Sequence, residues 1–269
     1  MQNKTIGIIG VGNMGEAILR GLYDKGIKGA IVSESRPERR DYIKKTYDVA
    51  VVTDNQKLAA QAQVIILAVK PQELKGVLQE IAPALDAATI LISIAAGASL
   101  GTIAAILEKE VRLVRAMPNI AALSLEAATA LAAGGGATAQ DVEIAQEIFN
   151  ALGKTVVIPE GLMDAVTGMS GSGPAYVCLF IEALADGGVR MGLPRKDALA
   201  LAIQTVLGTA RLLAEQGEHP AHLKDRVASP GGTTIAGIAA LEAKGFRGAV
   251  LEAVAAATQR SKELAKIQG

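Results

Sequence analysis

Aromatic residues are scarce in this sequence, and its charges cancel. The 269 residues include four Tyr, three Phe and no Trp, so few side chains could stack against the bases of a nucleic acid. Lys and Arg number 27, as do Asp and Glu, so no net charge attracts a phosphate backbone. We therefore expect no nucleic-acid partner.

Cysteine and histidine are just as scarce. Cys178 is the single cysteine, which excludes a disulfide within the chain and a zinc site built from Cys-x-x-Cys pairs. The two histidines, His219 and His222, could supply only part of a metal site. Residues 1–15 lack the basic, apolar and small-residue order of a secretory signal. The sequence therefore predicts no metal cofactor and a cytoplasmic protein.

One uncharged segment is long enough to cross a bilayer. Residues 87–107 contain no Asp, Glu, Lys or Arg, as in a membrane span. However, Thr89–Ile94 is rich in β-branched residues, as buried parallel strands are. An Ala- and Gly-rich turn separates it from a helical stretch, Ser99–Leu107. We expect two elements of an α/β domain here, and no membrane partner.

Strand and helix patterns alternate as far as residue 158. Segments such as Glu16–Lys25 and Pro71–Leu85 have helical patterns, whereas Ala127–Ala132 fits either structure. Such alternation predicts right-handed βαβ units and a mostly parallel sheet. The expected strands are the short Val- and Ile-rich runs Thr5–Ile9, Ala30–Val32, Val49–Val52, Val64–Val69, Thr89–Ile94, Val111–Arg115 and Thr155–Ile158.

The rest of the chain reads as helix. Its apolar residues spread over wide arcs, and such helices need partners on several sides, which favours dimerisation through this half. We therefore predict two domains, residues 1–158 and residues 159–269, the second for substrate binding and self-association. Its expected helices are Pro174–Arg190, Pro194–Gly217, Thr234–Lys244 and Phe246–Ile267.

A glycine-rich motif, GVGNMG at residues 10–15, follows the first expected strand and opens a helix. In such a loop Gly10 permits the tight turn, Gly12 lets a pyrophosphate approach, and Gly15 lets helix and strand pack closely. The helix N-terminus then offers free N–H groups to the phosphates. The sequence therefore predicts a dinucleotide-binding, Rossmann-type α/β fold, with a doubly wound, mostly parallel sheet followed by an all-helical C-terminal domain.

The end of the second expected strand bears on which dinucleotide is bound. Glu34 could hold the ribose hydroxyls of NAD, whereas Arg36 could accept the 2′-phosphate of NADP. The hydroxyls of Ser33 and Ser35 together with Arg36 suit a phosphate better, so NADP is favoured over NAD. The alternative is that Arg36 is a solvated charge before the helix that begins at Pro37.

Four further segments are candidate binding elements. Residues 68–71 (AVKP) and 117–119 (MPN) follow strands, where ligands of doubly wound sheets bind, although both are also ordinary turn sequences. Residues 170–176 (SGSGPAY) and 229–234 (SPGGTT) each precede a helix. Small residues, hydroxyls and a helix N-terminus suit a carboxylate, and helix capping is the alternative. A serine hydrolase is disfavoured, because no GxSxG motif is formed.

These segments resemble the pyrroline-5-carboxylate reductase family. Residues 223–235 (LKDRVASPGGTTI) resemble its signature segment, and the similarity extends over essentially the full length. The family varies after the second strand, and Arg226 stands where some members have asparagine. The other matching blocks are the glycine-rich motif, AVKP at 68–71, DAVTGMSGSGPAY at 164–176 and ALADGGVRMGLP at 183–194.

The resemblance implies roles for individual residues. The pyrophosphate would contact Gly10, Gly12, Asn13, Met14 and Gly15. The adenosine and nicotinamide riboses would lie along Asn55, Ala68, Val69, Lys70 and Pro71. Ser35 and Arg36 are cofactor candidates from the end of the second strand, where the resemblance assigns no contact because the family varies. The substrate would be bound by Ser229, Gly232, Thr233 and Thr234, with Thr234 as the catalytic candidate nearest its ring nitrogen.

The implied reaction reduces 1-pyrroline-5-carboxylate to L-proline with NADPH or NADH, the last step of proline biosynthesis. A cyclic imine can enter already protonated, so hydride delivery needs orientation more than a strong acid. This agrees with the lack of a Lys or His between Ala175 and Leu184. The alternatives are a related imine or 3-hydroxyacid oxidoreductase, and a dinucleotide-sensing protein without turnover. The resemblance also implies assemblies built from dimers.

Overall fold

The computed structural model describes residues 4–27 and 29–268 and divides into two compact units. One unit comprises the chain up to Ser172 together with the part from Ala256 onward, and the other comprises Gly173–Ala255. The boundary between the units lies later in the chain than the one predicted from the sequence, after residue 158. Met163, which follows the predicted boundary, packs into one of the apolar cores of the first unit. Residues 1–3, within the segment where we expect no signal sequence, lie outside the described residues.

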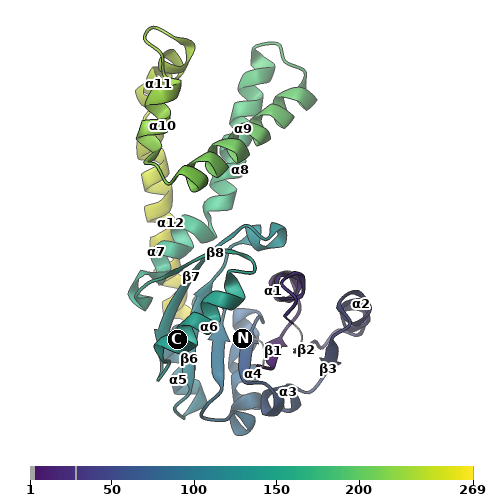
Figure 1. Ribbon diagram of the computed structural model, residues 1–269. Coiled ribbons are helices and arrows are strands. Elements are labelled where there is room, and N and C mark those ends of the chain that lie inside the picture. Colours follow the sequence, from purple (N-terminus) through teal and green to yellow (C-terminus); the bar gives the residue numbers. More distant parts are fainter. Residues whose placement is uncertain (1–3, 28, 269) are drawn as a thin grey trace. The chain divides into compact units, whose positions relative to one another are not determined.

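The first unit is built on an eight-stranded sheet in the order β3-β2-β1-β4-β5-β6-β7-β8 (Figure 1). Neighbouring strands run parallel except β6 and β7, which are antiparallel. The ambiguous run Ala127–Ala132 lies in β7, because it pairs with two strands along its length. The strands are β1 Ile6–Ile9, β2 Ala30–Ser33, β3 Ala50–Val52, β4 Val64–Leu67, β5 Ile90–Ser93, β6 Arg112–Met117, β7 Ala127–Gly134 and β8 Gly153–Val157.

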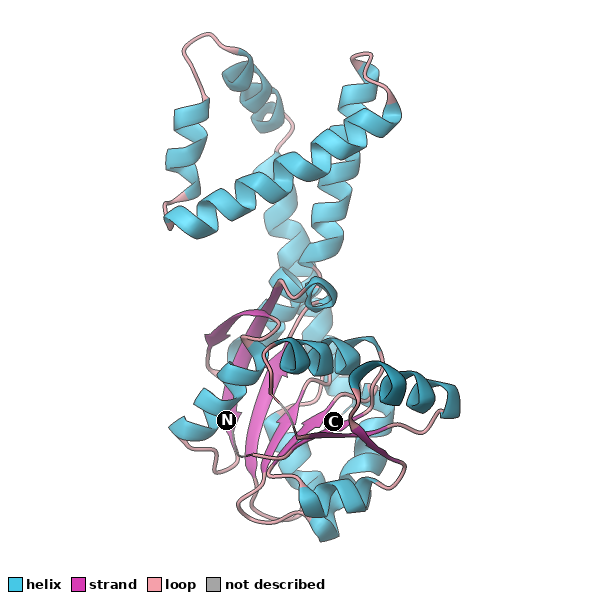
Figure 2. Cartoon of the chain, turned by 45° about the vertical axis from the view of Figure 1, so that its right-hand side comes forward, coloured by secondary structure: helices cyan, strands magenta, loops and turns pink. Residues whose placement is uncertain are grey.

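Helices cover both faces of this sheet (Figures 1 and 2). One core joins the sheet to α1 (Asn13–Asp24), α2 (Pro37–Tyr47) and α6 (Ala139–Phe149). A second core joins it to α3 (Asn55–Gln61), α4 (Pro71–Ile81) and α5 (Leu100–Leu107). Neighbouring strand residues such as Ile8 and Ile9 enter opposite cores, which is why the strands read as continuous apolar runs. The predicted fold class is confirmed.

The uncharged segment 87–107 forms two elements, β5 and α5, as the sequence predicts. Among the described residues, one helix is long and apolar enough to cross a membrane, α9 (Arg195–Gln216). This is weak evidence for a span, because it rests on length and composition alone. Short 3-10 helices occur at Ala82–Ala84, Ile120–Ser124 and Glu160–Leu162.

The helical part of the chain begins with a short helix, α7 (Met163–Val166), and a π-helical turn, Thr167–Gly171. It continues as α8 (Gly173–Arg190), which packs against α9 around Ala185, Ala198 and Ala202. Three more helices follow, α10 (Pro220–Val227), α11 (Thr233–Ala243) and α12 (Phe246–Gln268).

Helix α10 was not predicted from the sequence because it is short and polar. Pro220 occupies its first position, where a missing N–H costs nothing. The Nδ1 of His219 accepts a hydrogen bond from the Ala221 N–H at 3.2 Å and so caps the helix. This histidine is therefore engaged locally. Among the described residues, no group of three or more His, Cys, Asp or Glu side chains is placed to hold a metal ion.

Candidate active site

The site is built where the strand order of the sheet reverses. Ile9 at the end of β1 pairs with Leu67 at the end of β4, so the segments that follow these strands leave the same edge side by side. The Ala68 N–H donates to the Ile9 carbonyl at 2.8 Å, and the Gly10 N–H donates to the Ser33 carbonyl at 2.9 Å. In doubly wound sheets, ligands bind at this switch point.

The three glycines of the loop differ in what surrounds them. Gly10 has φ +88°, and a Cβ on it would lie 2.9 Å from the Ala68 carbonyl oxygen. A Cβ on Gly15 would collide with the Gly10 carbonyl oxygen, so glycine allows α1 to pack against the loop. A Cβ on Gly12 would meet no atom within 4 Å. Gly12 therefore borders an open cradle in front of the N-terminus of α1.

A cavity of about 800 Å³ opens from this cradle. All the predicted cofactor residues line it except Gly15, which packs behind the loop, and Pro71, which is the first residue of α4. Its wall also includes Thr53, Glu73 and Val77, which the sequence analysis did not single out. Thr53 could have been found, because it follows β3 at the same sheet edge. The complete lining is Ile9, Gly10, Gly12, Asn13, Met14, Ser33, Glu34, Ser35, Arg36, Thr53, Asn55, Ala68, Val69, Lys70, Glu73 and Val77.

Glu34 and Arg36 form an ion pair at one end of this cavity. The Nε and Nη2 of Arg36 donate to the two carboxylate oxygens of Glu34, each at 3.0 Å. The Arg36 backbone N–H adds a third hydrogen bond at 3.0 Å. Burial alone would raise the pKa of the Glu34 carboxyl. The hydrogen bonds and the charge of Arg36 outweigh this effect and lower the pKa to about 2. Both oxygens that could serve a ribose are therefore engaged by Arg36.

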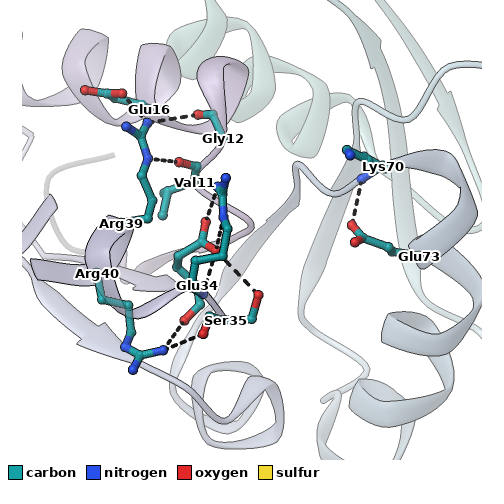
Figure 3. Close-up of polar contacts among 10 residues, drawn as sticks. Val11, Gly12, Glu16, Glu34, Ser35, Arg39, Arg40, Lys70 and Glu73 are labelled. Carbon is teal, nitrogen blue, oxygen red and sulfur yellow. Dashed lines mark hydrogen bonds and ion pairs between the residues drawn. The ribbon is translucent and has the colours of Figure 1, made fainter. Parts of the chain in front are cut away.

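The same end of the cavity is held by further polar contacts. The Nη1 of Arg40 donates to the carbonyls of Ser35 at 2.6 Å and Glu34 at 3.3 Å (Figure 3). The side chain of Asn55 accepts from the Ser33 hydroxyl at 2.6 Å and donates to Glu80 at 2.7 Å. These contacts fix the backbone after β2 and the side chain of Asn55 in the cavity wall.

The opposite wall carries Lys70 and Glu73. Lys70 precedes α4, and its backbone N–H donates to the Glu73 carboxylate at 3.3 Å (Figure 3). Arg36 and Lys70 thus bring two cations to the cavity, and Glu34 and Glu73 bring two carboxylates. The open cradle at Gly12, the helix N-terminus and the two cations fit the phosphates of a dinucleotide.

The predicted substrate residues share one turn in the second compact unit. Gly232 is the N-cap of α11, and its N–H donates to the Ser229 carbonyl at 3.1 Å. Thr233 and Thr234 occupy the first two positions of the helix, where backbone N–H groups have no intrahelical acceptor. Ser229 is exposed and Thr234 half-buried. The turn therefore presents hydroxyl and N–H donors together, as a carboxylate requires.

The other glycine and hydroxyl cluster, residues 170–176, requires a correction. We expected it to offer a free helix N-terminus, but the chain is already helical from Met163. The Ser172 N–H donates to the Thr167 carbonyl at 2.9 Å, and the Ser170 hydroxyl donates to the Val166 carbonyl at 3.2 Å. The π-helical turn therefore uses donors that we had assigned to an anion. The Nδ2 of Asn119 donates to the Ser170 carbonyl at 3.0 Å, which ties the MPN turn to this segment.

Comparisons with known proteins identify the family of this chain. Residues 160–264 match the family model described as pyrroline-5-carboxylate reductase dimerisation. Residues 5–97 match the model described as NADP oxidoreductase coenzyme F420-dependent. The pyrroline-5-carboxylate reductase of Synechocystis sp. is 52% identical to this chain, with 97% of this chain and 98% of that protein covered.

Solved structures give the same result. A pyrroline-5-carboxylate reductase from Coxiella burnetii superposes with a TM-score of 0.95 at 35% identity, covering 97% of this chain and 98% of that one. The Plasmodium falciparum pyrroline carboxylate reductase, solved with NADP bound, gives a TM-score of 0.85 at 33% identity and covers 98% and 99% of the two chains. As its signature segment predicts, the chain belongs to the pyrroline-5-carboxylate reductase family.

Proposed function

We propose that this protein reduces 1-pyrroline-5-carboxylate to L-proline with NADPH as the preferred hydride donor. The observation that carries the proposal is the open cradle at Gly12, placed beside Arg36 in one cavity of a chain of this family. A pyrophosphate fits the cradle, and the guanidinium at the adenosine end favours a 2′-phosphate. The NADP-bound Plasmodium relative supports this preference.

The cofactor residues act by binding and orientation. Backbone N–H groups of the loop and of the first turn of α1 would bind the pyrophosphate. Ser35 and Arg36 would hold the 2′-phosphate, and Asn55 would meet the adenosine ribose. The segment Ala68–Pro71 would lie along the nicotinamide ribose, at the sheet edge that it shares with the glycine-rich loop.

The substrate residues are assigned by chemistry. When bound, NADPH supplies the hydride that C5 of the protonated imine accepts, which leaves the neutral ring amine of proline. Thr234 would orient the ring nitrogen by its hydroxyl without acting as a strong acid. Ser229, Gly232 and Thr233 would hold the substrate carboxylate through the donors at the N-terminus of α11.

We further propose that residues 1–158 form the dinucleotide-binding domain and residues 159–269 the substrate-binding and dimerisation domain. The match of residues 160–264 to the dimerisation model supports this division. Large apolar side chains exposed in the second compact unit support self-association, among them Leu179, Met191, Leu201, Leu207 and Leu251. A cytoplasmic location completes the proposal.

An activity panel tests this function. NADPH absorbance is followed with NADPH and 1-pyrroline-5-carboxylate, with NADPH and an unrelated cyclic imine, and, in the oxidative direction, with NADP+ and several 3-hydroxy acids. The proposal predicts turnover with the pyrroline at a kcat/KM at least tenfold above that of any other compound. Preference for a hydroxy acid would contradict it, and so would NADPH binding without any turnover.

A further inference from the structure

Arg39 lies behind the glycine-rich loop and not in the wall of the cavity. Its Nε donates to the Val11 carbonyl at 2.7 Å, and its Nη2 donates to the Gly12 carbonyl at 3.5 Å (Figure 3). The same Nη2 is paired with the carboxylate of Glu16, in the first turn of α1. One guanidinium from α2 therefore joins two consecutive carbonyls of the loop to the helix that follows it.

Glu16 is held in turn by two tyrosines of α2. The hydroxyls of Tyr42 and Tyr47 each donate to its Oε1 at 3.0 Å. Burial raises the pKa of the Glu16 carboxyl, but the hydrogen bonds from Arg39 and both tyrosines bring it below its ordinary value. The guanidinium also lies 5.1 Å from the centre of the Tyr42 ring, a cation–π distance. Arg39 is therefore fixed on several sides.

These contacts determine where the N–H groups of the loop point. The peptide bonds of this loop are trans, and in a planar trans peptide the C=O and the following N–H point in opposite directions. Because the Val11 carbonyl points toward Arg39, the Gly12 N–H of the same peptide points away from Arg39. The Gly12 carbonyl accepts hydrogen bonds from Arg39 and, at 2.9 Å, from the Glu16 N–H. The Asn13 N–H, which belongs to the same peptide, therefore also points away from Arg39. Gly12 and Asn13 both line the cavity.

We propose that Arg39 is a positioning residue that presets the N–H groups of Gly12 and Asn13 toward the pyrophosphate. The inference rests on the proposed function, because it needs a dinucleotide in the cavity. The pyrophosphate is common to NADH and NADPH, so the role of Arg39 serves both cofactors equally. This separates it from Arg36, whose predicted partner is present only on NADPH.

The test compares Arg39→Met and Arg39→Lys with Lys45→Met, which removes a charge from an exposed position on the same helix. Dissociation constants for NADPH and NADH are measured by calorimetry, and amide hydrogen exchange of residues 10–16 is measured without cofactor. We expect Arg39→Met to weaken both cofactors equally, by about 10- to 100-fold, and to speed exchange in the loop but not in α6. At saturating NADPH, kcat should stay near that of the unsubstituted protein.

The lysine variant separates positioning from charge and covers the case in which Arg39→Met does not fold. A lysine keeps the charge but cannot reproduce the fork of donors, so positioning predicts at most partial rescue. Full affinity in Arg39→Lys would show that only the charge matters and would overturn the inference. A loss of affinity for NADPH but not for NADH would also overturn the inference, because it would place Arg39 at the 2′-phosphate. If the unsubstituted protein bound neither cofactor, the proposed function itself would fail.

Discussion

At the residue scale, the pairing of Glu34 with Arg36 is the feature that the sequence could not reveal. The sequence places an acid and an arginine two residues apart, which favours NADP over NAD but leaves both possible. In the structure, Arg36 donates hydrogen bonds to both carboxylate oxygens of Glu34. The carboxylate that could select NAD therefore orients Arg36, the residue that we propose selects NADP.

Replacing Arg36 tests this arrangement. Arg36→Ala should weaken NADPH binding by about 5- to 150-fold, because a charge-assisted contact to the 2′-phosphate is lost. NADH binding should barely change. Titration calorimetry with both cofactors checks this, with Lys45→Ala as a control for net charge. Equal small effects on both cofactors would mean that Arg36 is only a solvated charge.

Thr234 offers a second prediction at this scale. Gly232, and not a threonine, is the N-cap of α11, and no side-chain hydrogen bond caps the helix. Thr234→Val keeps the shape and should lower kcat/KM for the pyrroline by about 10- to 1000-fold, as expected for one polarising contact. NADPH affinity and the melting temperature should stay unchanged. Near-normal turnover with a stability loss of about 1 kcal/mol would favour a capping role instead.

At the scale of elements, the sequence was informative wherever a pattern is local. Strand runs such as Val64–Leu67 and the turn at Gly10 appear where the sequence predicts them. The polar helix α10 was missed because it is short, and the π-helical turn at Thr167–Gly171 was not predicted either. The direction of β7 could not be read because it depends on a distant partner, the strand β6. The clamp of Arg39 on the loop was missed for the same reason, because it joins residues far apart in sequence.

Glu160 ties the start of the helical half to the sheet. Its Oε1 accepts from the Leu100 N–H at the start of α5 at 2.6 Å and from Arg115 Nη1 of β6 at 3.2 Å. Arg115 is only 7% exposed, so its charge depends on this partner. Glu160→Ala should lower the free energy of unfolding by about 1–3 kcal/mol, as measured by urea denaturation. The control Glu143→Ala, at an exposed position on α6, should lower the free energy of unfolding only slightly. Equal losses of stability in the two variants would contradict the role assigned to Glu160.

At the scale of the whole molecule, the exposed apolar helices of residues 173–255 require a partner surface. Light scattering after size exclusion should give a mass at least twice that of one 27.6 kDa chain. The isolated chain leaves side chains such as Leu251 71% exposed, and burying them stabilises an assembly by the hydrophobic effect. A monomer that keeps full activity at all concentrations would contradict the proposed role of this half.

In the proposed reaction, hydride passes from a nicotinamide bound at the glycine-rich loop to C5 of the pyrroline. The protein is incubated with 1-pyrroline-5-carboxylate and NADPH that carries deuterium at the transferred position of its ring, and proline is analysed by mass spectrometry. We expect L-proline with a single deuterium, located at C5. Proline without deuterium, or the absence of proline while NADPH remains intact, would contradict this proposal.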